Sequence, residues 1–137
     1  MDNTDIEILK QLKKNSRIRE NKLAQLVHMT PPSVSARIKQ LEDKNVIKKY
    51  TIEVDPSKLG YTHQVFIETE MTHLSHKIYL EFIHSKQQFI LHHYRISGQM
   101  NYMIQGGFPS NDELNNFLEL LNEYANYKVL HIISELI

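Results

Sequence analysis

The sequence TPPSVSARIKQLEDKNVIKKY, residues 30–50, decides the first half of the fold. It predicts a helix beginning after Thr30, because a hydroxyl suits the N-cap and a proline at the first helical position loses no hydrogen bond. Asn45 follows the last expected turn and tolerates the left-handed conformation common at a helix C-terminus. On a helical wheel three apolar residues fall within about 40° of one another: Val34, Ile38 and Leu41. We therefore expect an amphipathic helix with one buried stripe.

The outward side of this helix carries small, polar and basic residues in its first half. Such a helix suits the major groove of DNA, which a recognition helix enters by its N-terminal residues. Lys39 and Gln40 would reach base edges, and Arg37 a guanine or a phosphate. The residues predicted to bind DNA are Thr30, Ser33, Ser35, Ala36, Arg37, Lys39, Gln40, Lys48 and Lys49. The alternative is the same arrangement used for contacts with another protein.

Charge is distributed unequally along the chain, although 16 basic and 16 acidic residues balance. Residues 1–60 carry 12 Lys and Arg against 8 Asp and Glu, whereas residues 61–137 carry 4 against 8. Residues 10–49 alone hold 11 basic against 3 acidic residues. A basic first half joined to an acidic second half is typical of a polyanion-binding module coupled to another function. A solvated basic face is the alternative.

Two further helices are predicted before the one quoted above. Thr4 and Glu7 fit a capping box at the start of the first helix. A second, short helix covers about 20–27. The residues expected to point inward are Ile6, Leu9, Leu12, Leu23, Leu26 and Val27, with Ile8 beside the first stripe. The spacing of these apolar residues indicates two amphipathic helices.

Residues 46–54 are rich in β-branched side chains and predict a short β wing. Proline and glycine interrupt the chain just after it, and the charge balance changes sign there. We therefore expect a winged helix-turn-helix domain over 1–54, with its helix-turn-helix at about 22–41. A linker over 55–62 would join it to a C-terminal domain over 63–137.

The second half alternates between strand and helix patterns. Strands are expected over 63–71, 89–97, 102–108 and 127–136, with one helix over about 76–85 and another after Pro109. Gly106 and Gly107 suggest a bulge in the third strand. The order βαββαβ predicts a ferredoxin-like domain, so the fold class is α+β.

One face of this predicted sheet needs no covering by the two helices. Phe66, Phe89 and Leu91 are expected on it, among charged residues. A half-polar solvated face is one interpretation. A homodimer that buries this face against its twin explains the apolar side chains better.

Much of the chain resembles the Lrp/AsnC family of transcription regulators. The similar stretches are the quoted segment, DIEILKQLKKNSRI at 5–18, KLAQLV at 22–27 and DPSKLGY at 55–61. YRISGQMNYMIQG at 94–106 resembles the signature of that family's effector domain, called RAM. The resemblance implies sequence-specific binding of double-stranded DNA, homodimers often assembled into octamers, and often a response to an amino acid.

An effector site is expected at the turn formed by Gly98, Met100, Asn101 and Tyr102. Gly98 lets the chain turn with positive φ, and Asn101 offers both a donor and an acceptor. Asn101 stands where the family usually carries Asp, and an amide cannot pair with an α-ammonium as a carboxylate does. The turn could instead be structural, which would make the protein an architectural or effector-independent DNA binder.

Other chemistry finds little support in the sequence. There is no Cys, and His73-x-x-His76 and His92-His93 lack a third ligand at recognisable spacing, so we expect no metal or other cofactor. No Walker loop, nucleophile elbow or HExxH motif is present, so no enzyme is expected. Tyr94-Arg95 beside the histidines raises one enzyme alternative, a haem-precursor decarboxylase of similar fold. The lack of a membrane-length apolar run predicts a soluble, cytoplasmic protein.

Overall fold

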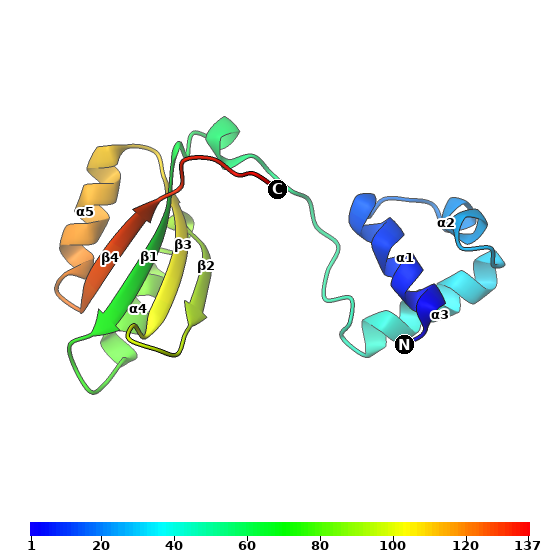
Figure 1. The fold of residues 1–137 in the computed structure, drawn as a ribbon, viewed down its shortest axis with the longest axis horizontal. Coiled ribbons are helices and arrows are strands. Elements are labelled where there is room, and N and C mark those ends of the chain that lie inside the picture. Colours follow the sequence, from blue (N-terminus) through cyan, green and yellow to red (C-terminus); the bar gives the residue numbers. More distant parts are fainter. The chain divides into compact units, whose positions relative to one another are not determined.

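The computed structural model describes all 137 residues, which form two compact units. We call Met1–Glu53 the N-terminal unit and Val54–Ile137 the C-terminal unit. The first is made of helices, and the second of a sheet with helices (Figure 1). Each unit has its own cluster of buried apolar side chains. None of the helices combines the length and the apolar character needed to cross a membrane.

The N-terminal unit consists of α1 (Asn3–Lys14), α2 (Glu20–Leu26) and α3 (Pro31–Asp43). All three helices contribute to its core, which is made of Ile8, Leu23, Ala24, Val34 and Leu41. Ile8 is 0% exposed, whereas Ile6 is 41% and Leu26 43% exposed, so the predicted inward position of Ile6 and Leu26 is wrong. Ile6 precedes Ile8 by two residues, which turns its side chain about 200° away around the helix.

The start of α1 also differs from the prediction. Its capping box is formed by Asp2 and Asp5, not by Thr4 and Glu7. The Asp5 N–H donates to Asp2 Oδ1 at 2.9 Å, and the Asp2 N–H donates to Asp5 Oδ2 at 3.0 Å. Aspartate caps a helix as well as threonine does, and this earlier pair satisfies two backbone donors reciprocally.

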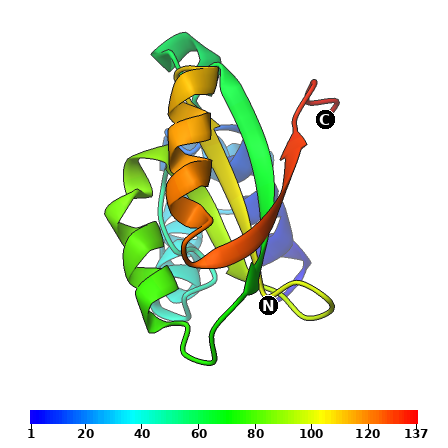
Figure 2. The ribbon, with the colours of Figure 1, turned by 90° about the vertical axis from the view of Figure 1, so that its left-hand side faces the viewer.

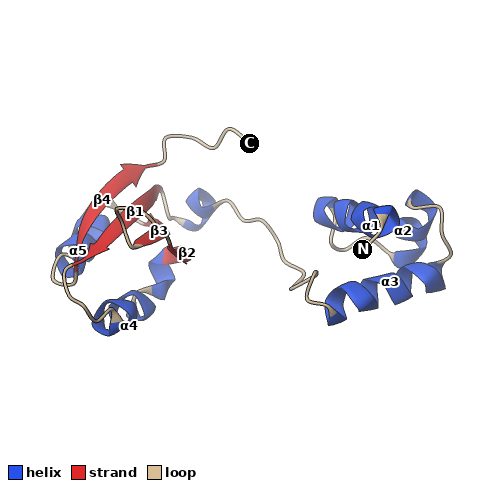
Figure 3. Cartoon of the chain, turned by 60° about the horizontal axis from the view of Figure 1, so that its bottom comes forward, coloured by secondary structure: helices blue, strands red, loops and turns tan.

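Residues 46–54 form no strand, so the β pairing predicted for the wing is corrected to a loop (Figure 3). β-branched residues favour an extended backbone, but a strand also needs a partner for its backbone hydrogen bonds. Here the carbonyl of Thr51 only accepts from the Ser16 hydroxyl, at 3.5 Å. The segment therefore has no sheet partner within the chain.

The C-terminal unit confirms the predicted order βαββαβ. Its elements are β1 (His63–Met71), α4 (Lys77–Ser85), β2 (Ile90–Arg95), β3 (Tyr102–Phe108), α5 (Asn111–Leu121) and β4 (Ala125–His131), with 3-10 turns at Pro56–Leu59 and Gln87–Phe89. The sheet is antiparallel in the order β2-β3-β1-β4. Both helices lie on one face of it (Figure 2), over a core that includes Tyr79, Phe108 and Phe117. No helix of this unit covers the opposite face of the sheet.

The predicted bulge lies on a different strand from the one expected. The register shifts between Ile90 and His92 of β2, opposite β3, while β3 itself stays regular. Gly106 instead allows a close approach, because a Cβ there would lie 3.0 Å from the Phe89 carbonyl. The 3-10 turn and the bulge together change which residues face the helices, since a shift of one residue exchanges the faces of a strand. Phe89 therefore stacks on Phe108 in the core at 4.9 Å, and its predicted place on the open face is wrong.

Candidate nucleic-acid interface

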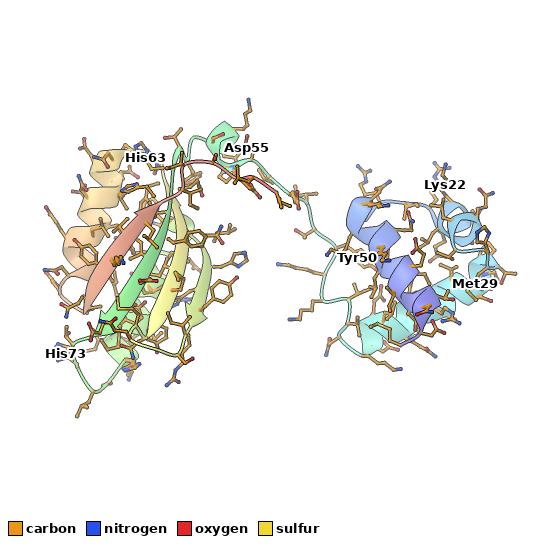
Figure 4. All side chains as sticks on the ribbon, viewed as in Figure 1. Lys22, Met29, Tyr50, Asp55, His63 and His73 are labelled. Carbon is orange, nitrogen blue, oxygen red and sulfur yellow. The ribbon has the colours of Figure 1, made fainter.

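α2 and α3 form a helix-turn-helix with a short, tightly bonded turn. His28, two residues after α2, has the left-handed conformation with φ of 57°, and Met29 N–H donates to the Ala24 carbonyl at 3.0 Å. Thr30 is the N-cap of α3, and Pro31 follows at the first position. The Thr30 side chain caps no backbone N–H and instead donates to the Ser33 hydroxyl at 2.9 Å. Met29 packs partly against the core, which fixes the turn (Figure 4).

The predicted buried stripe of α3 faces the core, since Val34 is 0% and Leu41 4% exposed. The opposite side is open to solvent and carries Ser35, Ala36, Lys39 and Gln40, with Ser33 and Arg37 half-buried beside them. A surface hollow of about 580 Å³ runs along this side of α3 to the start of α1. Its lining includes Ser33, Ala36, Arg37, Gln40 and Lys44, together with Asp2 and Asp5 of the α1 capping box.

The basic side chains of this surface differ in whether they form ion pairs with carboxylates. Arg37 is engaged, because its Nη1 lies 2.8 Å from Asp2 Oδ2 and 3.0 Å from Asp5 Oδ1. Lys39 lies 3.5 Å from Asp43 in an exposed pair, which binds it only weakly. Lys48 and Lys49 are exposed and pair with no carboxylate.

The segment that carries Lys48 and Lys49 is tied back to α3 by one side chain. Tyr50, labelled in Figure 4, donates to Glu42 Oε1 at 2.7 Å. Burial, and then this bond to a carboxylate, raise the pKa of Tyr50 to about 12. The bond from Tyr50 to Glu42 holds the two lysines near the C-terminal end of α3.

The turn predicted to bind an effector is built around Asn101. Gly98 has φ of 123°, which favours glycine. The Asn101 side-chain oxygen accepts from Met71 N–H at 2.7 Å, and the Asn101 N–H donates to the Thr69 carbonyl at 2.8 Å. These bonds fasten the turn to the end of β1. Met100 is half-buried beside it.

A network of histidines and hydroxyls lies between α4 and the sheet. The Tyr102 hydroxyl is 2.9 Å from His76 Nδ1, and the Tyr79 hydroxyl is 2.9 Å from both Thr69 Oγ1 and His93 Nε2. Burial lowers the pKa of His93, which favours its neutral form. These polar atoms are hydrogen-bonded within the core.

The remaining histidines do not gather into a metal centre. His73 lies in the loop after β1 (Figure 4), and His92 stacks on Tyr94 at 5.7 Å. No group of three or more His, Cys, Asp or Glu side chains is placed to hold a metal ion.

Sequence reasoning missed the two carboxylates that bind Arg37. It also missed the contact of Glu42 with Tyr50. The acid pair at the start of the chain was a visible signal, because two aspartates three residues apart can share one face of a helix. Their partner on α3 is 35 residues from Asp2 and 32 from Asp5 in the sequence, and only the packing of α1 against α3 identifies it.

A helix-turn-helix with an open, partly basic second helix defines a DNA-binding protein. Comparison with known proteins supports the same class. The sequence model of the winged helix-turn-helix DNA-binding family matches residues 1–48. The HTH-type transcriptional regulator LrpA of Bacillus subtilis is 38% identical over 135 residues, which cover 98% of this chain and 99% of that relative. The solved structure of B. subtilis LrpC is 32% identical with a TM-score of 0.94, and the match covers 99% of this chain and 96% of LrpC.

The chain belongs to the Lrp/AsnC family, and it is a transcription regulator of that type. The transcriptional regulator NMB0573 of Neisseria meningitidis, solved in complex with L-Met, has the same fold. It is 23% identical with a TM-score of 0.86, and the match covers 98% of this chain and 91% of that one.

Proposed function

We propose that the protein binds duplex DNA by placing the N-terminal half of α3 in the major groove. The observation that carries this proposal is the outward side of α3, where Ser33, Ala36 and Gln40 leave room for a close approach to base edges. Glutamine is suited to a bidentate contact with adenine. Lys48 and Lys49 would bind flanking phosphates, which position the protein without reading sequence.

The variant Gln40→Ala tests whether Gln40 contacts a base. It should weaken binding to the selected duplex by about 1–3 kcal/mol and leave binding to random duplex nearly unchanged. Gln88→Ala, at an exposed position of the C-terminal unit, is the matched control and should bind as the wild type does. A Gln40→Ala protein with undiminished preference for the selected duplex would remove Gln40 from the site.

We further propose that two copies pair through the open face of the sheet. Phe66, Gln105 and Leu130 are neighbours across three strands, as the register of β1 with β3 and β4 requires. Leu130 is 42% and Tyr94 50% exposed, which is unusual for large apolar side chains on a solvated sheet. A two-fold dimer would bury this patch against its own copy.

Leu130→Lys should convert the dimer to a monomer in sedimentation, because two unpaired ammonium groups would then face an apolar interface. Ile78→Lys is the control, since Ile78 is 62% exposed on α4, on the other side of the sheet. The dimer proposal fails if the wild type is monomeric at all concentrations, or if Leu130→Lys sediments as the wild type does.

An amino-acid effector at the turn of Gly98 to Tyr102 is the finer part of the proposal. The L-Met complex of NMB0573 supports an amino-acid effector. Gly98 supports its place at this turn, because no side chain covers the backbone there. The Asn101 Nδ2 makes no hydrogen bond within the chain and could donate to a carboxylate. Ligand binding there would shift DNA affinity by linkage.

A thermal shift against the twenty amino acids tests the effector site. An amino acid at about 100 times its dissociation constant should stabilise the protein by about 2.7 kcal/mol. Asn101→Ala should lose the shift. Asn101→Asp keeps an acceptor for Met71 N–H and should bind an α-ammonium at least as well. If no amino acid produces a shift with any of these proteins, the turn is structural.

A further inference from the structure

One nitrogen of Arg37 joins the start of α1 to the middle of α3. Arg37 Nη1 donates to Asp2 Oδ1 at 2.9 Å, to Asp2 Oδ2 at 2.8 Å and to Asp5 Oδ1 at 3.0 Å. Asp2 and Asp5 are also the two members of the α1 capping box. The orientation of these carboxylates is therefore set by the backbone of α1 and not by free side-chain rotation.

The charge balance of this cluster opposes a direct contact between Arg37 and DNA. Two carboxylates surround one guanidinium, so the cluster of Asp2, Asp5 and Arg37 carries a net charge of about −1 at neutral pH. The hydrogen bond from Arg37 holds the pKa of Asp2 below its usual range, and the bonds to Asp2 and Asp5 raise the pKa of Arg37. If Arg37 bound a DNA phosphate instead, Asp2 and Asp5 would both lose the cation that pairs with them.

The burial of Arg37 and Asp5 points the same way, although Asp2 is 57% exposed. The Arg37 side chain is 28% exposed and Asp5 only 16%, whereas Lys39 on the same helix is 75% exposed. Arg37 therefore lies in the groove between the two helices, while Lys39 projects from α3 into solvent. The side chains best placed to meet DNA lie one turn on either side of Arg37.

We propose that Arg37, held by Asp2 and Asp5, is a positioning residue for DNA recognition and contacts neither base nor phosphate. The cluster fixes α3 against the N-terminus of α1 and so sets the angle at which Ser33 and Gln40 enter the groove. Sequence selectivity depends on that angle, because a base contact needs hydrogen-bond geometry while phosphate attraction does not. This inference rests on the proposed function of α3.

A direct contact between Arg37 and DNA predicts a change in DNA affinity of the opposite sign. If Arg37 left its carboxylates to bind DNA, then removing the charge of Asp5 would free it and strengthen binding. Asp5→Asn is therefore the deciding variant. The amide keeps the shape of the carboxylate and one oxygen for the Asp2 N–H. It removes the charge and puts an NH2 donor where Asp5 Oδ1 accepts from Arg37, so that contact is lost.

The experiment measures affinity for a selected duplex and for a random duplex across a series of salt concentrations. The proteins are the wild type, Asp5→Asn, Arg37→Gln and the double variant, studied below the melting transition of each. In each single variant, the ratio of the affinity for the selected duplex to the affinity for the random duplex should fall about fivefold. The double variant should also fall by no more than about fivefold, because both changes remove the same contact. A change in stability alone would lower both affinities equally and leave the ratio unchanged.

The salt series supplies the second readout. The slope of log affinity against log salt should be the same for Arg37→Gln as for the wild type. Lys48→Gln, the control for a phosphate contact, should lower the slope by about one. Tighter binding by Asp5→Asn, a slope lowered by about one in Arg37→Gln, or additive losses in the double variant would each overturn the proposal. A wild type without salt-dependent DNA binding would instead refute the proposed function itself.

Discussion

Raising the salt from about 50 mM to about 200 mM should weaken binding to duplex DNA by about a thousandfold. The N-terminal unit carries 11 Lys and Arg against 7 Asp and Glu, and Lys48 and Lys49 pair with no carboxylate. Each lysine that meets a phosphate releases a counterion, and this release makes affinity fall as salt rises. Two copies on one operator double the number of such contacts. Titrations followed by fluorescence anisotropy at several salt concentrations measure the slope.

The double variant Lys48→Ala/Lys49→Ala identifies the source of that slope. It should lower the slope by about two for each bound copy, since each phosphate contact contributes about one. Lys77→Ala/Lys86→Ala removes two exposed or partly exposed lysines from the C-terminal unit and is the matched control. A slope unaffected by the first variant would show that the segment after α3 does not touch DNA.

Ile8→Ala should unfold the N-terminal unit and abolish DNA binding while the C-terminal unit stays folded. Ile8 is 0% exposed at the centre of a core of five buried residues, and truncation of such a side chain costs about 2–5 kcal/mol. A unit of this size has little stability to lose, because small domains bury a small fraction of their surface. The C-terminal unit has a separate core that contains no residue of α1.

Ile6→Ala is the control for this prediction, because Ile6 lies on the same helix and is 41% exposed. Its cost should be about 0.5 kcal/mol or less. Amide hydrogen exchange distinguishes the two units directly, since α1 to α3 should lose protection in Ile8→Ala while β1 and β3 keep it. Loss of protection in both units together would show that their folding is coupled.

The sequence predicted most of the elements because its local signals were strong. Thr30 with two prolines marked the start of α3, and Pro109 with Ser110 marked the start of α5, where the Ser110 side chain accepts from Glu113 N–H at 3.1 Å. The order of strands and helices was sufficient to predict the sheet. Periodicity thus identified the elements and the buried stripe of α3.

The errors arose where tertiary partners decide the structure. Residues 46–54 have the composition of a strand, but no second strand lies beside them. Phe89 was placed on the wrong face because it lies in the 3-10 turn before β2, outside the alternation of the strand. The carboxylate partners of Arg37 were not foreseen, because Asp2 and Asp5 precede it by 35 and 32 residues at the start of α1. None of these three facts has a local signature.

Selection of bound duplexes from a random pool tests the central claim most directly, namely that two copies of α3 read a symmetric site in DNA. The wild-type protein should enrich an inverted repeat whose half-sites are separated by about one helical turn or a multiple of it. The same selection with Gln40→Ala should relax the preference at one position of each half-site. Recovery of a pool with no enriched sequence, at a salt concentration where the protein binds, would contradict the claim.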